Sequence, residues 1–70
     1  MRLVEELADN LAKDAIELAN KLGNDDVICE AAKVLVATES AMEEAYRTSI
    51  RVRLAERHAR RFFEEKAQGT

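Results

Sequence analysis

Several residue types that shape or staple small proteins are scarce in this 70-residue chain. It has no proline and no tryptophan, two glycines, one cysteine and an aromatic content of 4%. The single cysteine, Cys29, excludes an internal disulfide, and no Cys/His cluster has the spacing of a zinc site. Without a disulfide or a metal, a core of this size rarely supplies more than about 3–5 kcal/mol. We therefore expect self-association to stabilise the fold.

Long apolar runs are also missing. Charged residues at positions 2, 5, 6 and 9 interrupt the start of the chain, so we expect no signal peptide. No stretch approaches the ~20 apolar residues that a membrane-spanning helix needs. The free thiol of Cys29 fits a reducing compartment. Together these features predict a cytoplasmic protein that has no membrane partner.

The chain between residues 25 and 67 contains neither glycine nor proline. Nearly every residue in it is a fair helix former, so this segment predicts one helix of about 43 residues, or ~65 Å at 1.5 Å per residue. The segment that precedes it can cover only about half of that length. The mismatch indicates that a second copy of the chain covers the remainder.

The first helix is predicted over about residues 2–22, because its apolar residues recur with the period of a helix. Four alanines form one stripe, and larger residues form a second stripe beside it. The second stripe contains Val4, Leu7, Leu11, Leu18 and Leu22. Together the stripes span about half of the circumference, more than the ~100° needed to face one partner. This helix therefore needs two neighbours, and a hairpin supplies only one.

Gly23 is the predicted end of the first helix, since glycine adopts the positive φ of a C′ position at no steric cost. Asn24, Asp25 and Asp26 then supply a cap and first-turn acids for the next helix. A turn over 23–25 is short enough to make the two helices antiparallel neighbours. We predict an all-α antiparallel helical hairpin, one domain over residues 1–70, that dimerises into a four-helix bundle.

The continuity of the long helix over 25–67 is the open point of this architecture. Its apolar positions follow one heptad register up to Ala45, and the same register would then place charged residues in the core. A three-residue shift of register resolves the conflict within one helix. The alternative is a break near residues 38–40, because Ser40 and Glu43 have the spacing of a capping box. That break would give a three-helix bundle.

The predicted oligomer interface follows from these two helices. The alanine stripe needs a second neighbour, and the shifted register ends in two phenylalanines beyond the reach of the first helix. The candidate interface residues are Ala8, Ala12, Ala15, Ala19, Ala45, Val52, Ala59, Phe62 and Phe63. An exposed phenylalanine pair is an aggregation hazard, which favours its closure in a homodimer.

Charge is distributed unevenly along the chain. Residues 1–46 carry eleven acidic and four basic side chains, whereas residues 47–70 carry three acidic and seven basic ones. Most of the later basic residues are arginines, which make planar, bidentate contacts with carboxylates or phosphates. The candidate binding residues are Arg47, Arg51, Arg53, Arg57, Arg60 and Arg61.

Two kinds of partner suit these arginines. Acids of the first helix in another subunit would neutralise them, as would acids one turn away, such as Glu43 beside Arg47. The phosphate backbone of a nucleic acid is the alternative. The net charge of −3 and the lack of aromatic residues among the arginines favour the carboxylates.

No combination of residues in the sequence indicates catalysis. His58 is the only histidine and has no Cys, Asp or Glu at ligand spacing on its face, so we expect no metal. Asp26 and Glu30 oppose thiolate formation at Cys29, which has no general base nearby in the sequence. We predict a protein that is not an enzyme and has no cofactor and no small-molecule substrate.

The expected function is therefore that of a small regulatory or adaptor protein. It would bind a protein partner and act as a homo-oligomeric helical bundle. The alternative is a helical hairpin that binds RNA or DNA through the arginine-rich segment 47–61.

Overall fold

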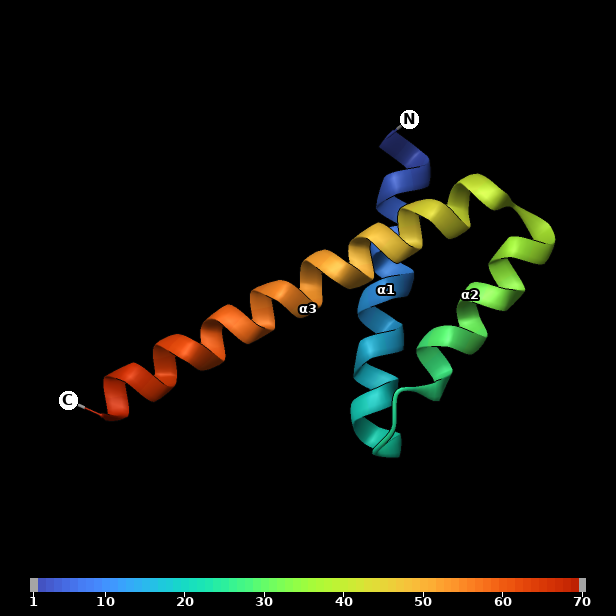
Figure 1. Ribbon diagram of the computed structural model, residues 1–70. Helices are drawn as coiled ribbons and strands as arrows, with labels where there is room; N and C mark the ends of the chain where they lie inside the picture. The colour runs from blue at the N-terminus through green and yellow to red at the C-terminus, as the bar shows by residue number, and fades with distance from the viewer. Residues whose placement is uncertain (1, 70) are drawn as a thin grey trace.

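Three α-helices and no strands make up residues 2–69, the part of the chain that the computed structural model describes. α1 spans Arg2–Leu22, α2 spans Asp26–Thr38 and α3 spans Ser40–Gln68. α1 and α2 form a hairpin, and α3 folds back to cross α1 before it continues away from both (Figure 1). The all-helical class predicted from the sequence is confirmed.

The turn between α1 and α2 depends on two residues. Gly23 has a φ of 78°, a conformation that glycine adopts without strain, and its N–H donates to the carbonyl of Ala19 over 2.9 Å. The side-chain oxygen of Asn24 accepts from the N–H of Asp26 over 3.0 Å and so starts α2. The chain therefore reverses direction within a few residues.

The chain breaks within the segment 25–67, so the single long helix predicted there is wrong. Glu39 lies between α2 and α3 with an extended backbone, at φ −158° and ψ 104°. The alternative prediction, a break near residues 38–40, is confirmed. A continuous helix of ~65 Å would leave much of its length without a neighbour. The break instead turns α3 back onto α1.

Side chains at the break form hydrogen bonds with the backbone of both helix ends. The hydroxyl of Thr38 donates to the carbonyls of Val34 and Leu35, over 3.1 and 3.2 Å. The carboxylate of Glu39 accepts from the N–H of Ala41 over 2.9 Å. The break therefore requires neither glycine nor proline: Glu39 alone is extended, and its own carboxylate caps the start of α3.

The core between the three helices consists largely of alanine. Ala8 and Ala12 of α1 are fully buried, since α3 packs directly across this face. Such small side chains let helix axes approach closely. The remaining buried apolar residues are Ala15, Ile16, Ala19, Ala32, Tyr46 and Ile50.

The buried alanines correct the predicted oligomer interface. Ala8, Ala12, Ala15 and Ala19 are covered within one chain, so they need no second copy. Ala45 is partly buried against the same core. The prediction was wrong because it assumed that the hairpin offers α1 only one neighbour, whereas the break supplies a third helix.

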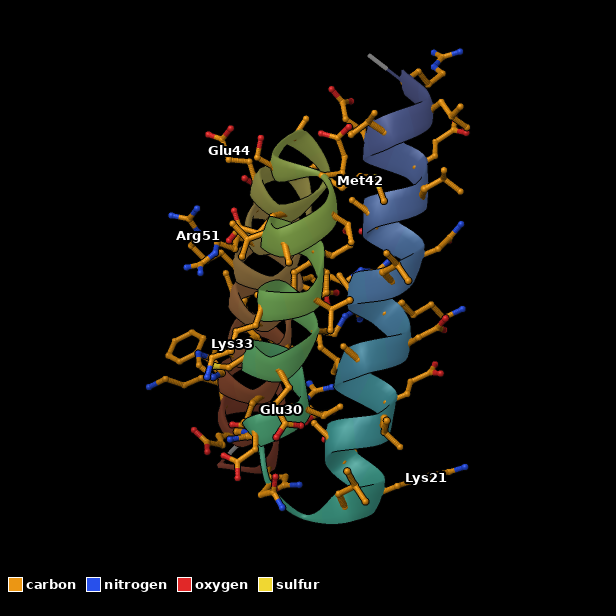
Figure 2. The ribbon with its side chains drawn as sticks, turned by 90° about the vertical axis from the view of Figure 1, so that its right-hand side faces the viewer. Lys21, Glu30, Lys33, Met42, Glu44 and Arg51 are labelled. Atoms are coloured by element: carbon orange, nitrogen blue, oxygen red, sulfur yellow. The ribbon has the colours of Figure 1, made fainter. Side chains whose placement is uncertain are left out.

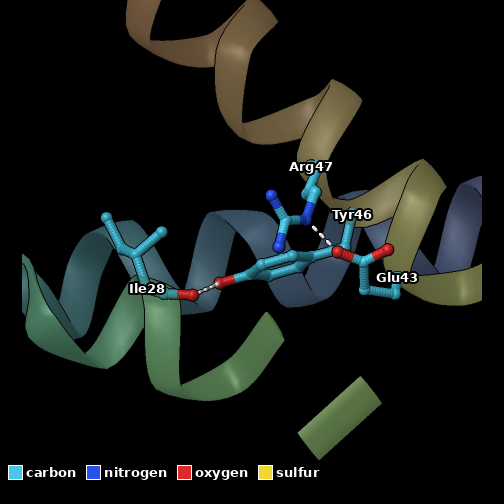
Figure 3. Close-up of polar contacts among 4 residues, drawn as sticks. All are labelled: Ile28, Glu43, Tyr46 and Arg47. Carbon is cyan, nitrogen blue, oxygen red and sulfur yellow. Dashed lines mark hydrogen bonds and ion pairs between the residues drawn. The ribbon is translucent and has the colours of Figure 1, made fainter. Parts of the chain in front are cut away.

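Tyr46 connects α3 to α2. It is 1% exposed, and its hydroxyl donates to the carbonyl of Ile28 over 2.8 Å (Figure 3). Burial raises the pKa of the Tyr46 phenol above its ordinary value, and the nearby Cys29 adds to the shift. Beside it, the nearly buried Glu43 forms an ion pair with Arg47 one turn further along α3. The predicted Glu43–Arg47 pair is thus confirmed.

We expect Tyr46→Phe to lower the free energy of unfolding by about 1 kcal/mol, because it removes one hydrogen bond and keeps the ring. Tyr46→Ala, which also leaves a cavity, should cost about 3–5 kcal/mol. Urea denaturation at neutral pH, followed by circular dichroism, measures both changes. Equal losses in the two variants would show that the ring packing contributes nothing.

The raised pKa of Tyr46 predicts a further dependence on pH. Its stabilising contribution is complete below the unfolded-state pKa and is lost as the pH rises through the higher folded-state pKa. Because Tyr46 is the one tyrosine of the chain, absorbance of the phenolate reports its titration directly. Tyr46→Phe should remove this part of the alkaline loss of stability.

Candidate interaction surfaces

The outer faces of the three helices carry most of the large apolar side chains. The Cα atoms extend over 49 × 28 × 13 Å, so the molecule is thin and every helix meets solvent. The exposed large apolar residues are Leu3, Leu7, Leu11, Leu18, Leu22, Val34, Val36, Val52, Phe62 and Phe63. Since alanine fills the core, these bulkier residues define the candidate sites.

An apolar groove lies along the outside of the α1–α2 hairpin. Leu11 and Leu18 of α1 and Val27 and Val34 of α2 form its walls, above the buried Tyr46. We call this site the leucine groove; its volume is about 310 Å³. Leu11 is 40% exposed, Leu18 43% and Val34 65%, so roughly half of this aliphatic surface meets water.

Two further leucines and one carboxylate belong to the surroundings of the leucine groove. Leu7 and Leu22 lie one turn before Leu11 and one turn after Leu18, on the same face of α1, and both are exposed. Asp14 contributes the charged side chain of the groove lining. This groove was not among the candidate sites predicted from the sequence. The signal was the excess width of the apolar arc on α1.

A second exposed surface runs along α3. Tyr46, Ile50 and Leu54 face the core, and the opposite side of the helix carries a different apolar stripe. This stripe, the α3 seam, consists of Thr48, Val52, Ala55, Ala59 and Phe62, all exposed. Val52, Ala59, Phe62 and Phe63 were predicted to lie in an oligomer interface, and they remain open to such a contact.

Arg53 forms the polar link between α3 and α1. Its guanidinium donates to both carboxylate oxygens of Asp9, from Nε over 2.9 Å and from Nη2 over 2.7 Å. This bidentate hydrogen bond lowers the pKa of Asp9 and raises that of Arg53. The carboxylate partner predicted for these arginines is therefore present, but within the same chain.

Three other candidate arginines also have partners. Arg57 donates to the side-chain oxygen of Asn20 over 3.5 Å, and Arg60 forms an ion pair with Glu56 one turn earlier. Arg47 is held by Glu43, as described above. Within residues 2–69, Arg51 and Arg61 show no hydrogen bond or ion pair. Two of the six arginines thus have no partner within this range.

Arg51 lies beside a groove between α2 and α3. Apolar residues line this groove, with the cations Lys33, Arg47 and Arg51 around it, and its volume is about 620 Å³. We call it the basic groove. Figure 2 shows Lys33 of α2 and Arg51 of α3 on the same side of the molecule. Cys29 also lines the groove and is exposed.

The described residues contain no group of three His, Cys, Asp or Glu side chains that could hold a metal ion. None of the three helices is long and apolar enough to cross a membrane, within the 2–69 range. Comparison with known proteins found no matching family model, no matching curated protein and no matching solved structure.

The Asp9–Arg53 pair predicts a specific loss of stability in acid. The pKa of Asp9 is lower in the folded state, so the pair stabilises the fold above the unfolded-state pKa and is lost as the pH falls through the folded-state pKa. Both side chains are more than one-third exposed, which limits the contribution to about 0.2–1 kcal/mol.

We therefore expect Asp9→Asn to destabilise the fold modestly at neutral pH and to flatten the acid arm of the stability curve. Asp14→Asn is the matched control, because Asp14 lies on the same helix away from Arg53. Urea melts between pH 2 and pH 7 measure both variants. The same flattening in Asp14→Asn would assign the acid sensitivity to general charge and not to this pair.

Proposed function

We propose that this protein is a small, non-enzymatic regulatory or adaptor protein that self-associates and binds another protein. The exposed leucine groove is the observation that carries this proposal. Monomeric proteins rarely leave contiguous large aliphatic surface open to water, and such surface commonly marks a protein-binding site. Here the leucines face outward while alanines fill the core.

The energetic argument follows from the unburied area. Full burial of a leucine or valine side chain contributes about 1.5–3 kcal/mol, and Leu11, Leu18 and Val34 realise only part of this within the chain. A partner that covered the groove would recover the rest. A chain of this size has few other sources of stability. Binding and folding are therefore expected to support each other.

An amphipathic helix of another protein is the occupant that suits the leucine groove. From Leu7 to Leu22 the apolar face of α1 extends over ~22 Å, which is about four turns of a helix. A helix with apolar residues at three- and four-residue spacing would fit between the Leu and Val walls. Asp14 favours a partner with a lysine or arginine beside those residues.

A second copy of the chain is the competing occupant of the leucine groove. Two hairpins that met through this face would form the four-helix bundle predicted from the sequence. Such a dimer would bring the two Asp14 carboxylates toward the same interface, which works against it. A partner with basic residues has no such penalty.

To test the groove, we would replace one residue from each wall, Leu18→Ser with Val34→Ser. The matched control is Leu3→Ser with Val36→Ser, which removes the same residue types from the same helices outside the groove. We expect the groove variant to lose at least about tenfold in affinity for the partner, equivalent to ~1.4 kcal/mol, and the control to retain it.

A photo-crosslinker at position 22, beside the groove and outside the substituted residues, identifies the occupant in the native host by mass spectrometry. A crosslink to a helix of another protein, formed by the wild type and lost in the groove variant, supports the proposal. A crosslink to a second copy of this chain would instead support the four-helix dimer. Equal recovery of the same proteins by wild type, groove variant and control would contradict a binding role for the groove.

The alternative function, binding of RNA or DNA through Arg47, Arg51, Arg53, Arg57, Arg60 and Arg61, is less well supported. Four of these side chains already contact Glu43, Asp9, Asn20 or Glu56. Phosphate contacts would have to compete with these partners or rest on Arg51 and Arg61. The net charge of −3 also opposes approach to a polyanion.

For nucleic acid we expect no dissociation constant tighter than about 100 μM at physiological salt, within the range of non-specific attraction. Fluorescence anisotropy with single-stranded RNA and duplex DNA at two salt concentrations measures it. The double variant Arg51→Gln with Arg61→Gln should then leave this weak affinity for nucleic acid unchanged. Sub-micromolar, salt-sensitive affinity that this double variant loses would favour the nucleic-acid function over the protein-binding one.

A further inference from the structure

The C-terminal part of α3 extends beyond the rest of the molecule. Residues 58–68, here called the arm, are all exposed. Figure 1 shows the orange-to-red end of α3 without a neighbouring helix. An isolated helix of about 11 residues is marginal in water, and most helical stability in proteins comes from packing. The arm therefore lacks the support that the first half of α3 receives from α1 and α2.

The α3 seam runs from the supported half of the helix into the arm. Its residues follow one another at spacings of four, three, four and three, which is the pattern of a coiled-coil contact. Val52 in the supported half is 62% exposed and Phe62 in the arm is 53% exposed. Both halves thus present matching apolar surface on the side of α3 that faces away from the core.

We propose that the α3 helices of two copies pair antiparallel through this seam, with the arm of each copy lying against the supported half of the other. The inference rests on the self-association included in the proposed function. It adds the surface, the direction of pairing and the residues that meet.

Antiparallel pairing matches side chains by size. About a two-fold axis near residue 57, Ala55 lies level with the partner's Ala59, and Val52 lies level with the partner's Phe62. Alanine opposite alanine allows close approach at the centre, and the larger residues close the two ends. In a parallel pair, Phe62 would instead lie level with Phe62 of the other copy, so large residues would face each other.

The direction of pairing also decides whether the arms gain support. In the antiparallel arrangement, each arm lies beside residues 46–56 of the partner, which α1 and α2 hold in place. In a parallel arrangement, the two arms would contact only each other, beyond both bodies. The hairpins of the antiparallel pair lie at opposite ends of the joined α3 helices, so they do not collide.

Charge complementarity favours the same register. Glu65 follows Phe62 by about one turn, and antiparallel pairing places it beside the partner's Arg51. Arg51 has no hydrogen bond or ion pair within residues 2–69 and lies at the basic groove with Lys33. The basic groove therefore offers the arm both cations and an apolar lining. Near the axis the Glu56 side chains of the two copies approach and repel each other. The ion pair of each Glu56 with Arg60 of the same chain offsets that repulsion.

The proposed pairing is isologous, since each copy supplies one arm and one basic groove. Such an interface closes on itself, so assembly stops at the dimer. It covers α3 and leaves the leucine groove of α1 and α2 open in both copies. The resulting molecule has two identical binding grooves for a partner, which suits an adaptor.

Sedimentation equilibrium of the purified chain tests this pairing, with an expected mass of about twice 7.9 kDa. Glu65→Arg should weaken dimerisation about tenfold or more, because it turns two attractions per dimer into repulsions. Glu65→Arg with Arg51→Glu should restore it. The two residues lie ~21 Å apart along one helix, so they can compensate each other only between chains.

Two further variants complete the test. Ala59→Glu, on an exposed site of the arm, should abolish the dimer and lower the helical circular dichroism by no more than the share of the arm, residues 58–68. Leu18→Ser with Val34→Ser should leave the dimer intact. Loss of partner binding therefore tests the leucine groove, and loss of the dimer tests the α3 pairing. A monomeric wild type, an unaffected Glu65→Arg dimer or failure of the double charge exchange would overturn the inference. So would a dimer that only the leucine-groove variant disrupts.

Discussion

The close crossing of α3 over the alanine face of α1 is the contact on which the rest of the structure depends. Ala8 and Ala12 are fully buried there, and any larger side chain would push the helices apart. The crossing also positions the polar links. Arg53 reaches Asp9 on one side of α3, and Tyr46 reaches the carbonyl of Ile28 on the other. One small-residue face thus orients all three helices.

A core of alanine has a consequence for the outer surface. Alanine buries little area, so close packing here provides fewer apolar contacts than a core of leucine would. The leucines of α1 and the phenylalanines of α3 are left on the outside, at Leu11, Leu18, Phe62 and Phe63. The stability that the single chain lacks and the surfaces that it exposes are therefore two aspects of the same packing arrangement.

The sequence predicted local features well and tertiary choices poorly. Leucine periodicity and Gly23 define α1 and its end because both are signals within one helix. The break at Glu39 was harder to predict, since neither glycine nor proline marks it and Glu39 itself caps α3. Periodicity separated the leucine and alanine stripes of α1. Which stripe faces the core depends on where α3 lies, and no local pattern determines that.

Local patterns also fail to show which residues the fold brings to the arginines. A run of arginines predicts that acceptors are present but not where they are, and the fold brings Asp9 to Arg53 from 44 positions away in the sequence. Once that link and those of Arg47, Arg57 and Arg60 are in place, Arg51 and Arg61 are the two candidate arginines that have no partner among the described residues 2–69. Arg51 lies where an acidic helix end would complement it, and α3 itself carries Glu64 and Glu65 beside Phe62. Within residues 2–69 no acid pairs with Arg51. In the proposed dimer a second copy would supply one, because its Glu65 follows the exposed Phe62 by about one helical turn.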